Sequence, residues 1–86
     1  AREVEKVALT VPGVLSAHKI RSRRGPRGGY ADLHVQLQGD LPLEEAHHIG
    51  HQVADRVRED LGVPDVLVHV EPAQAPDESG IHRRNT

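Results

Sequence analysis

The sequence predicts one small α+β domain, and three observations lead to that prediction. The chain has 86 residues, which is the size of a single domain. Apolar residues recur at helical spacing in two segments and alternate at strand spacing in two others. Gly and Pro separate these segments. The expected order is helix, strand, strand, helix, strand, which gives a three-stranded sheet with two helices on one face.

The first helix is predicted over residues 2–11, where one apolar stripe contains Val4, Val7, Ala8 and Val11. Pro12 and Gly13 end it. No capping residue precedes the stripe, and the sequence has no initiator Met. We therefore expect the chain to be a piece of a longer protein whose missing part could contain membrane spans.

A β-hairpin is predicted next, with strands over residues 14–23 and 30–37 joined by a turn of Arg, Gly and Pro. In the second strand, one face contains Ala31, Leu33, Val35 and Leu37, and the other contains Tyr30, Asp32, His34 and Gln36. Alternation in the first strand is ambiguous. The face on which His18 lies is therefore open at this point.

The second helix is predicted from a start marked by Asp40 and Pro42 to about Leu61, with Gly62 as its C-cap. Its inward residues are Leu43, Ala46, Ile49, Val53, Ala54, Val57 and Leu61. A last strand, residues 66–71, places Val66, Val68 and Val70 opposite Leu67, His69 and Glu71. The domain is expected over residues 1–72, and residues 73–86 are expected to form a disordered tail.

The amino-acid composition excludes some ways of stabilising the domain and argues against some classes of partner. The apolar residues of the chain are Val, Leu, Ile and Ala, with one tyrosine (Tyr30) and no Phe, Trp or Met. The core they can form is thin, and small domains with thin cores usually gain stability from disulfides, a metal or self-association. Cysteine is absent, so disulfides are excluded. The net charge of −2 does not indicate nucleic acid or an anionic membrane as a partner. The basic turn, residues 21–27, lacks the aromatic platforms of RNA-binding surfaces, and we interpret it as a solvated hairpin tip.

Three residues of ligand type share the open face of the predicted sheet. His69 and Glu71 leave the last strand on the same side, roughly 7 Å apart, and His34 lies opposite the apolar face of its own strand. Imidazole nitrogen and carboxylate oxygen both suit zinc, which usually has four ligands. The competing interpretation is that these are solvated polar residues, and the pattern alone leaves both open.

The helical histidines favour binding over catalysis. His47 and His51 are four residues apart, a spacing that can chelate metal from one helix. No Glu stands between them as in a metalloprotease motif, so the sequence does not favour an enzyme. His47 borders the apolar stripe, His48 faces solvent, and His51 is expected to be solvated. Whether His51 or His82 contributes to a site is open.

Several segments together resemble the C-terminal cytoplasmic domain of cation diffusion facilitator transporters, across residues 2–72. They are Val11-Pro12-Gly13-Val14, Ala17-His18-Lys19-Ile20-Arg21-Ser22-Arg23, Asp32-Leu33-His34-Val35, Leu41-Pro42-Leu43-Glu44-Glu45-Ala46-His47 and Val68-His69-Val70-Glu71-Pro72. The combination is specific although no single segment is.

The resemblance implies a metallochaperone-like (ferredoxin-like) fold and a homodimer on the cytoplasmic side of the inner membrane. The full-length relatives are antiporters that export Zn²⁺, or related ions such as Co²⁺, Ni²⁺, Cd²⁺, Fe²⁺ or Mn²⁺, in exchange for protons. The implied metal ligands are His18, His34, His47, His69 and Glu71. Metal binding near the dimer interface would favour the transport-competent state. The membrane domain of the same chain would be the other partner.

Two features of this ligand set differ from those of a single tetrahedral zinc site in the family. Five candidates exceed one tetrahedral ion, so either two metals share a bridging group or one residue is an outer partner that orients a ligand. Relatives often have Asp where this chain has Glu71, and the extra methylene lets the carboxylate reach further, so we expect a different site geometry and metal preference. The alternative functions are a free-standing cytosolic metal carrier or sensor of similar fold, and a purely structural dimerisation module.

Overall fold

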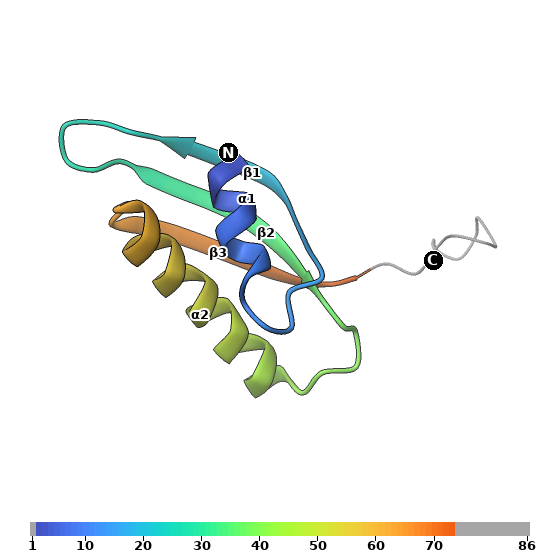
Figure 1. Cartoon of the computed structure of the whole chain (residues 1–86). Coiled ribbons are helices and arrows are strands. Elements are labelled where there is room, and N and C mark those ends of the chain that lie inside the picture. The colour runs from blue at the N-terminus through green and yellow to red at the C-terminus, as the bar shows by residue number, and fades with distance from the viewer. Residues whose placement is uncertain (1, 74–86) are drawn as a thin grey trace.

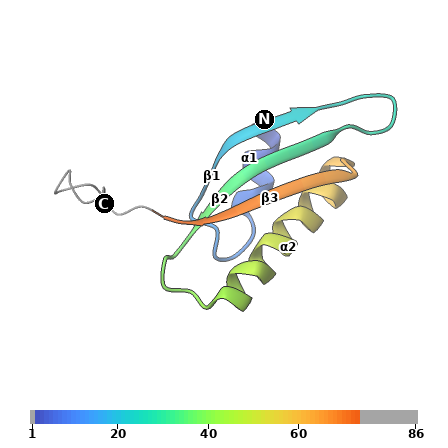
Figure 2. The same cartoon turned by 180° about the vertical axis from the view of Figure 1, so that it is seen from behind.

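The computed structural model describes residues 2–73, and its elements follow the predicted order (Figure 1). They are α1 (Arg2–Leu9), β1 (Ser16–Arg23), β2 (Tyr30–Leu37), α2 (Leu43–Leu61) and β3 (Asp65–Pro72). The sheet order is β1-β2-β3, with β1 antiparallel and β3 parallel to the central β2. Both helices cover one face of the sheet, and the other face is open (Figures 1 and 2). The α+β, metallochaperone-like fold is confirmed; the predicted tail from residue 74 lies outside the described residues.

The core lies between the helices and β2. Leu33, Val35 and Leu37 of β2 are fully buried, and the burial pattern of this strand alternates as predicted. Val4 and Ala8 of α1 and Val53 and Val57 of α2 pack on the same cluster. The open face of β2, in contrast, is only half-buried and polar. This division leaves one sheet surface free for polar chemistry.

A β-bulge in β1 explains why its alternation cannot be interpreted from the sequence. His18 pairs with His34, but the next pair is Arg21 with Asp32, so β1 contains one extra residue there. Lys19 absorbs the irregularity with a φ of 51°. The bulge reverses the side-chain parity, so both Ala17 and Ile20 pack on the core.

The start of α2 differs from the prediction, whereas its end agrees. The N-cap is Pro42, which makes no side-chain capping bond, so Asp40 does not cap the helix. Leu43 is 72% exposed, and its predicted inward position is wrong because the first turn of α2 lies away from the sheet (Figure 1). Gly62 adopts the left-handed conformation with a φ of 67°, and its N–H donates to the Arg58 carbonyl at 3.0 Å, as expected of a C-cap.

Candidate metal centre

The strand register places three histidines side by side across the open face. His18 of β1 pairs with His34 of β2, and His34 pairs with His69 of β3. The rings of His34 and His69 stack, with centroids 4.4 Å apart and an interplanar angle of 15°. The ring centroids of His18 and His34 are 5.7 Å apart. Folding therefore gathers three imidazoles from residues far apart in the sequence.

A carboxylate joins this row of histidines. Glu71 lies two register positions beyond the His34–His69 pair, opposite Gln36 and on the same face of the sheet. Its Oε2 lies 2.6 Å from His18 Nε2, and its Oε1 lies 3.2 Å from His34 Nδ1. The side chains of His18, His34 and Glu71 are 36%, 27% and 32% exposed, so the cluster is accessible to an ion from solvent.

Two neutral residues complete the network around the carboxylate. The Gln36 amide donates to Glu71 Oε2 at 3.3 Å, and the Ser16 hydroxyl donates to Gln36 Oε1 at 2.7 Å. Sequence reasoning assigned no role to either residue. Period-two alternation did place Gln36 on the face of His34, and that was the available signal. Ser16 gave no such signal because the bulge obscures the pattern of β1.

The hydrogen bonds determine which ring nitrogens remain free. An ionised carboxylate only accepts, so His18 donates from Nε2 and His34 donates from Nδ1. The lone pairs of His18 Nδ1 and His34 Nε2 are then available to a cation. A carboxylate that fixes the tautomer of a ligating imidazole is the usual outer partner in metal sites. The contacts of Glu71 are of this kind.

The fifth predicted ligand lies apart from the other four. His47 belongs to α2, on the covered side of the sheet, and lines a hollow of about 290 Å³ with His51, Arg58 and the edge of β3. The described contacts include none between His47 and the histidine row. His48 is exposed on the same helix, and His82 lies outside the described residues. The structure thus brings together four of the five predicted residues.

His18, His34 and Glu71 form a hydrogen-bonded cluster that His69 joins by stacking on His34, and the four residues do not form a preformed cage. Within residues 2–73, no three His, Asp or Glu side chains are posed around a common point as metal ligands are. The reason is visible in the contacts, because His18 and His34 point N–H groups at Glu71 instead of converging with it. Side-chain rotation alone can exchange such a hydrogen bond for a metal bond.

The network also lowers the pKa of the Glu71 carboxyl below its ordinary value of 4.5. The largest cause is the hydrogen bond from His18, followed by that from His34. A depressed carboxyl pKa contributes stability above the unfolded-state value, and the contribution is lost as pH falls through the lowered pKa.

Glu71→Gln is therefore expected to make the free energy of unfolding less dependent on pH at acid pH. The difference in free energy of unfolding between wild type and variant should be constant above pH about 5 and shrink toward pH about 3. Urea unfolding across that range, without metal, measures it. A difference that stays constant down to pH about 3 would show that the carboxylate gains nothing from its histidine partners.

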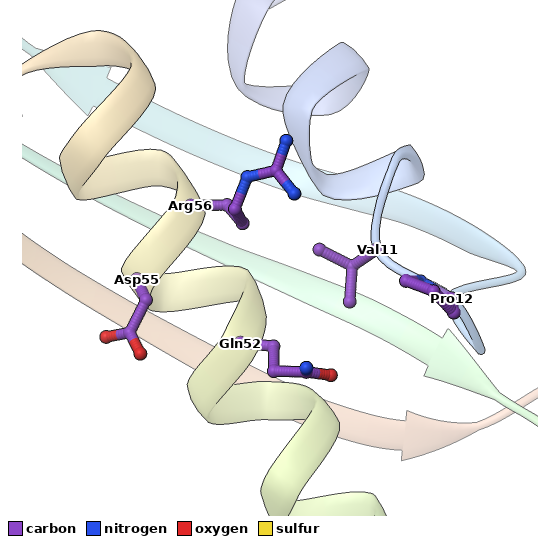
Figure 3. A pocket seen from close by; sticks show the side chains of 5 residues that line it. All are labelled: Val11, Pro12, Gln52, Asp55 and Arg56. Carbon is purple, nitrogen blue, oxygen red and sulfur yellow. The ribbon is translucent and has the colours of Figure 1, made fainter.

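A second hollow lies in the helix layer, away from these residues. It has a volume of about 220 Å³ and is lined by Val11, Pro12, Gln52, Asp55 and Arg56 (Figure 3). Asp55 is paired with Arg58 at 2.8 Å, and Arg56 is paired with Asp60 at 3.5 Å. Its charged groups therefore already have partners, and the open sheet face remains the better candidate.

Comparison with known proteins decides the family. The family described as "Cation efflux protein, cytoplasmic domain" matches residues 1–73. The chain belongs to the cation diffusion facilitators, as a C-terminal cytoplasmic domain. The cation-efflux pump FieF of Pectobacterium atrosepticum is 31% identical over 78 residues, 91% of this chain and 26% of the relative. FieF of Yersinia enterocolitica is 32% identical over 82 residues, 94% of this chain and 27% of the relative.

Solved structures of the family share the fold. A MamM CTD variant in its manganese form has a TM-score of 0.77 at 22% identity, covering 84% of this chain and 92% of that one. A nickel form of another variant has a TM-score of 0.78 at 22% identity, covering 85% and 94%. The chain spans only about a quarter of the length of the FieF relatives. No helix within residues 2–73 combines the length and apolar character that a bilayer span needs.

Proposed function

We propose that this chain is the cytoplasmic regulatory domain of a zinc/proton antiporter, and that it binds zinc and homodimerises to favour the transport-competent state. The observation that carries the proposal is the cluster of His18, His34, His69 and Glu71 on the open sheet face. The FieF relatives are cation-efflux pumps about three and a half times as long as this chain, which favours a domain of a transporter over a free-standing carrier.

The donor chemistry supports zinc as the metal. Zinc accepts both imidazole nitrogen and carboxylate oxygen as ligands, and no thiolate is present in the chain. The solved MamM CTD relatives include manganese, cadmium and nickel forms, so a domain of this fold accepts several divalent ions. By the Irving–Williams order, nickel and copper would also bind such a site in vitro. His18, His34 and His69 would ligate, and Glu71 would ligate or orient the first two.

Two observations support the dimer. The matching family is named ZT_dimer. His47 lies across the sheet layer from the other four predicted ligands and makes no described contact with them. A second copy of the chain could bring His47 to the cluster or use it in a separate bridging site. In either arrangement zinc stabilises the transport-competent dimer only if it binds that dimer more tightly than it binds the other states of the domain.

A zinc titration at two pH values tests the proposal. An imidazole must be deprotonated to ligate, so lowering the pH from about 7.5 to about 5.5 should weaken zinc binding at least tenfold. Isothermal titration calorimetry measures the affinity, and sedimentation equilibrium with and without zinc measures the dimer. Equal affinity at both pH values would exclude histidine ligation. If the fraction of dimer were the same with and without zinc, the proposal that zinc regulates dimerisation would be wrong.

A further inference from the structure

The turn between β1 and β2 is a basic projection that the metal centre does not use. β3 begins opposite Tyr30, so the three-stranded part of the sheet ends at that pair and residues 24–29 extend beyond it. Figures 1 and 2 show this loop reaching past both helices and the other strands. It contains Arg24 and Arg27, and Arg23 ends β1 at its base. We call Arg23, Arg24 and Arg27 the arginine tip.

The backbone of this loop is held in a defined turn. The Gly28 N–H donates to the Gly25 carbonyl at 3.0 Å, and Pro26 stands at the second position, where its fixed φ suits a turn. Gly28 has a φ of 99°, and a Cβ there would come within 2.7 Å of Pro64 Cδ. The loop thus fits closely against the start of β3. Arg27 occupies the apex of an ordered turn.

The charge of the arginine tip is not neutralised within the described part of the chain. The arginine ion pairs of residues 2–73 are Arg21 with Asp32, Arg56 with Asp60 and Arg58 with Asp55. The three arginines of the tip are exposed, and none of these pairs includes them. The net charge of −2 conceals this local excess. Three adjacent unpaired cations create a local potential that attracts an anionic surface.

The position of the arginine tip in the domain points to the membrane. Glu3 and Val4, in the first turn of α1, line a small hollow together with Arg23 and Arg24. Glu3 forms no described ion pair with either arginine. The first turn of α1 and the arginine tip are therefore at the same end of the domain. In a C-terminal domain the membrane portion leads into α1, so this end is the one nearest the bilayer.

We propose that the arginine tip docks on anionic phospholipid headgroups at the cytoplasmic face of the membrane. This inference rests on the proposed function only in taking the domain to be joined to a membrane portion ahead of α1. Guanidinium groups bind phosphate oxygens in bidentate pairs. The one aromatic residue of the chain, Tyr30, pairs with Arg23 at the base of the tip. RNA-binding surfaces stack successive bases on several aromatic side chains, so a single tyrosine favours headgroups over RNA. The contact would orient the domain against the bilayer independently of zinc.

Vesicle sedimentation with this chain tests the docking. Phosphatidylcholine vesicles containing about one-third phosphatidylglycerol should bind it at low salt, and pure phosphatidylcholine vesicles should not. Each arginine near such a surface contributes roughly a fivefold gain in partitioning, so R23Q/R24Q/R27Q should lose roughly a hundredfold. Raising the salt to about 0.5 M should also abolish binding.

A charge-matched variant separates the tip from a general effect of net charge. K6Q/R56Q/R58Q removes three exposed cations from α1 and α2 and should retain most of the partitioning. Equal losses in the two triple variants, or no binding by wild type, would overturn the proposal. So would wild-type binding to single-stranded RNA without binding to vesicles. Zinc affinity should be unchanged by the tip substitutions, so failure of the zinc site and failure of the docking are distinguishable.

Discussion

Zinc at a hundredfold excess over its dissociation constant is expected to raise the melting temperature of this chain by roughly 10–20 °C. Ligand binding to the folded state alone contributes about 2.7 kcal/mol at that ratio. In a domain of 60–100 residues, each kcal/mol shifts the melting temperature by about 4–8 °C. The effect is large because the domain is small and its buried core consists only of Val, Leu, Ile and Ala side chains.

Single substitutions locate the source of that shift. His34→Ala and His69→Ala remove neighbouring members of the stacked pair on the open face, and each should reduce the zinc-dependent shift to a few degrees or less. His48→Ala is the matched control, because His48 is exposed on α2. Differential scanning calorimetry of each variant with and without zinc compares shifts rather than absolute stabilities. If both His34→Ala and His69→Ala kept the wild-type shift in melting temperature, zinc would have to bind elsewhere.

Leu33→Ala is expected to remove at least about two-fifths of the free energy of unfolding in the absence of metal, and to lower the melting temperature accordingly. Leu33 is fully buried at the centre of β2, where helices cover it. Truncating a buried leucine to alanine costs about 2–5 kcal/mol through lost burial and the cavity that remains. The whole stability of a domain this size is roughly 5 kcal/mol. Circular dichroism against temperature measures the loss.

The control for this substitution uses the same chemistry at an exposed site. Leu43 is 72% exposed in the first turn of α2, so Leu43→Ala should change stability by about 0.5 kcal/mol or less in the monomer. Similar losses in the two variants would show that burial in the protomer does not decide stability. Repeating the pair with zinc tests whether the ion rescues the Leu33 variant by mass action.

The sequence predicted the element order because apolar periodicity is strong where one face of each element is buried. The alternation in β2 and the two apolar stripes, over residues 2–11 and along α2, identified nearly all of the core, including Leu33 and Val53. It also placed His34, His69 and Glu71 on the opposite face, since side-chain direction within a strand depends only on parity. Gly62 marked the end of α2 because a left-handed C-cap suits glycine.

The sequence pattern within one helix or strand could not predict the contacts between elements. Gly50 is buried because α2 approaches β3 so closely that a Cβ there would lie 2.9 Å from Val70 Cγ2. Leu43 fits the apolar stripe but is exposed, because a helical pattern does not show where the sheet beneath it stops. Gln36 became part of the candidate site only when the parallel register placed it opposite Glu71.

By itself, the sequence determined the fold class and the face on which His34, His69 and Glu71 lie. The tertiary structure decided the position of His18, because the bulge at Lys19 reverses the parity of β1 and leaves His18 beside Glu71. It also placed His47 on the other side of the sheet. The physical reason is the same in each case. Periodicity fixes directions within one element, whereas distances between elements depend on register, bulges and packing.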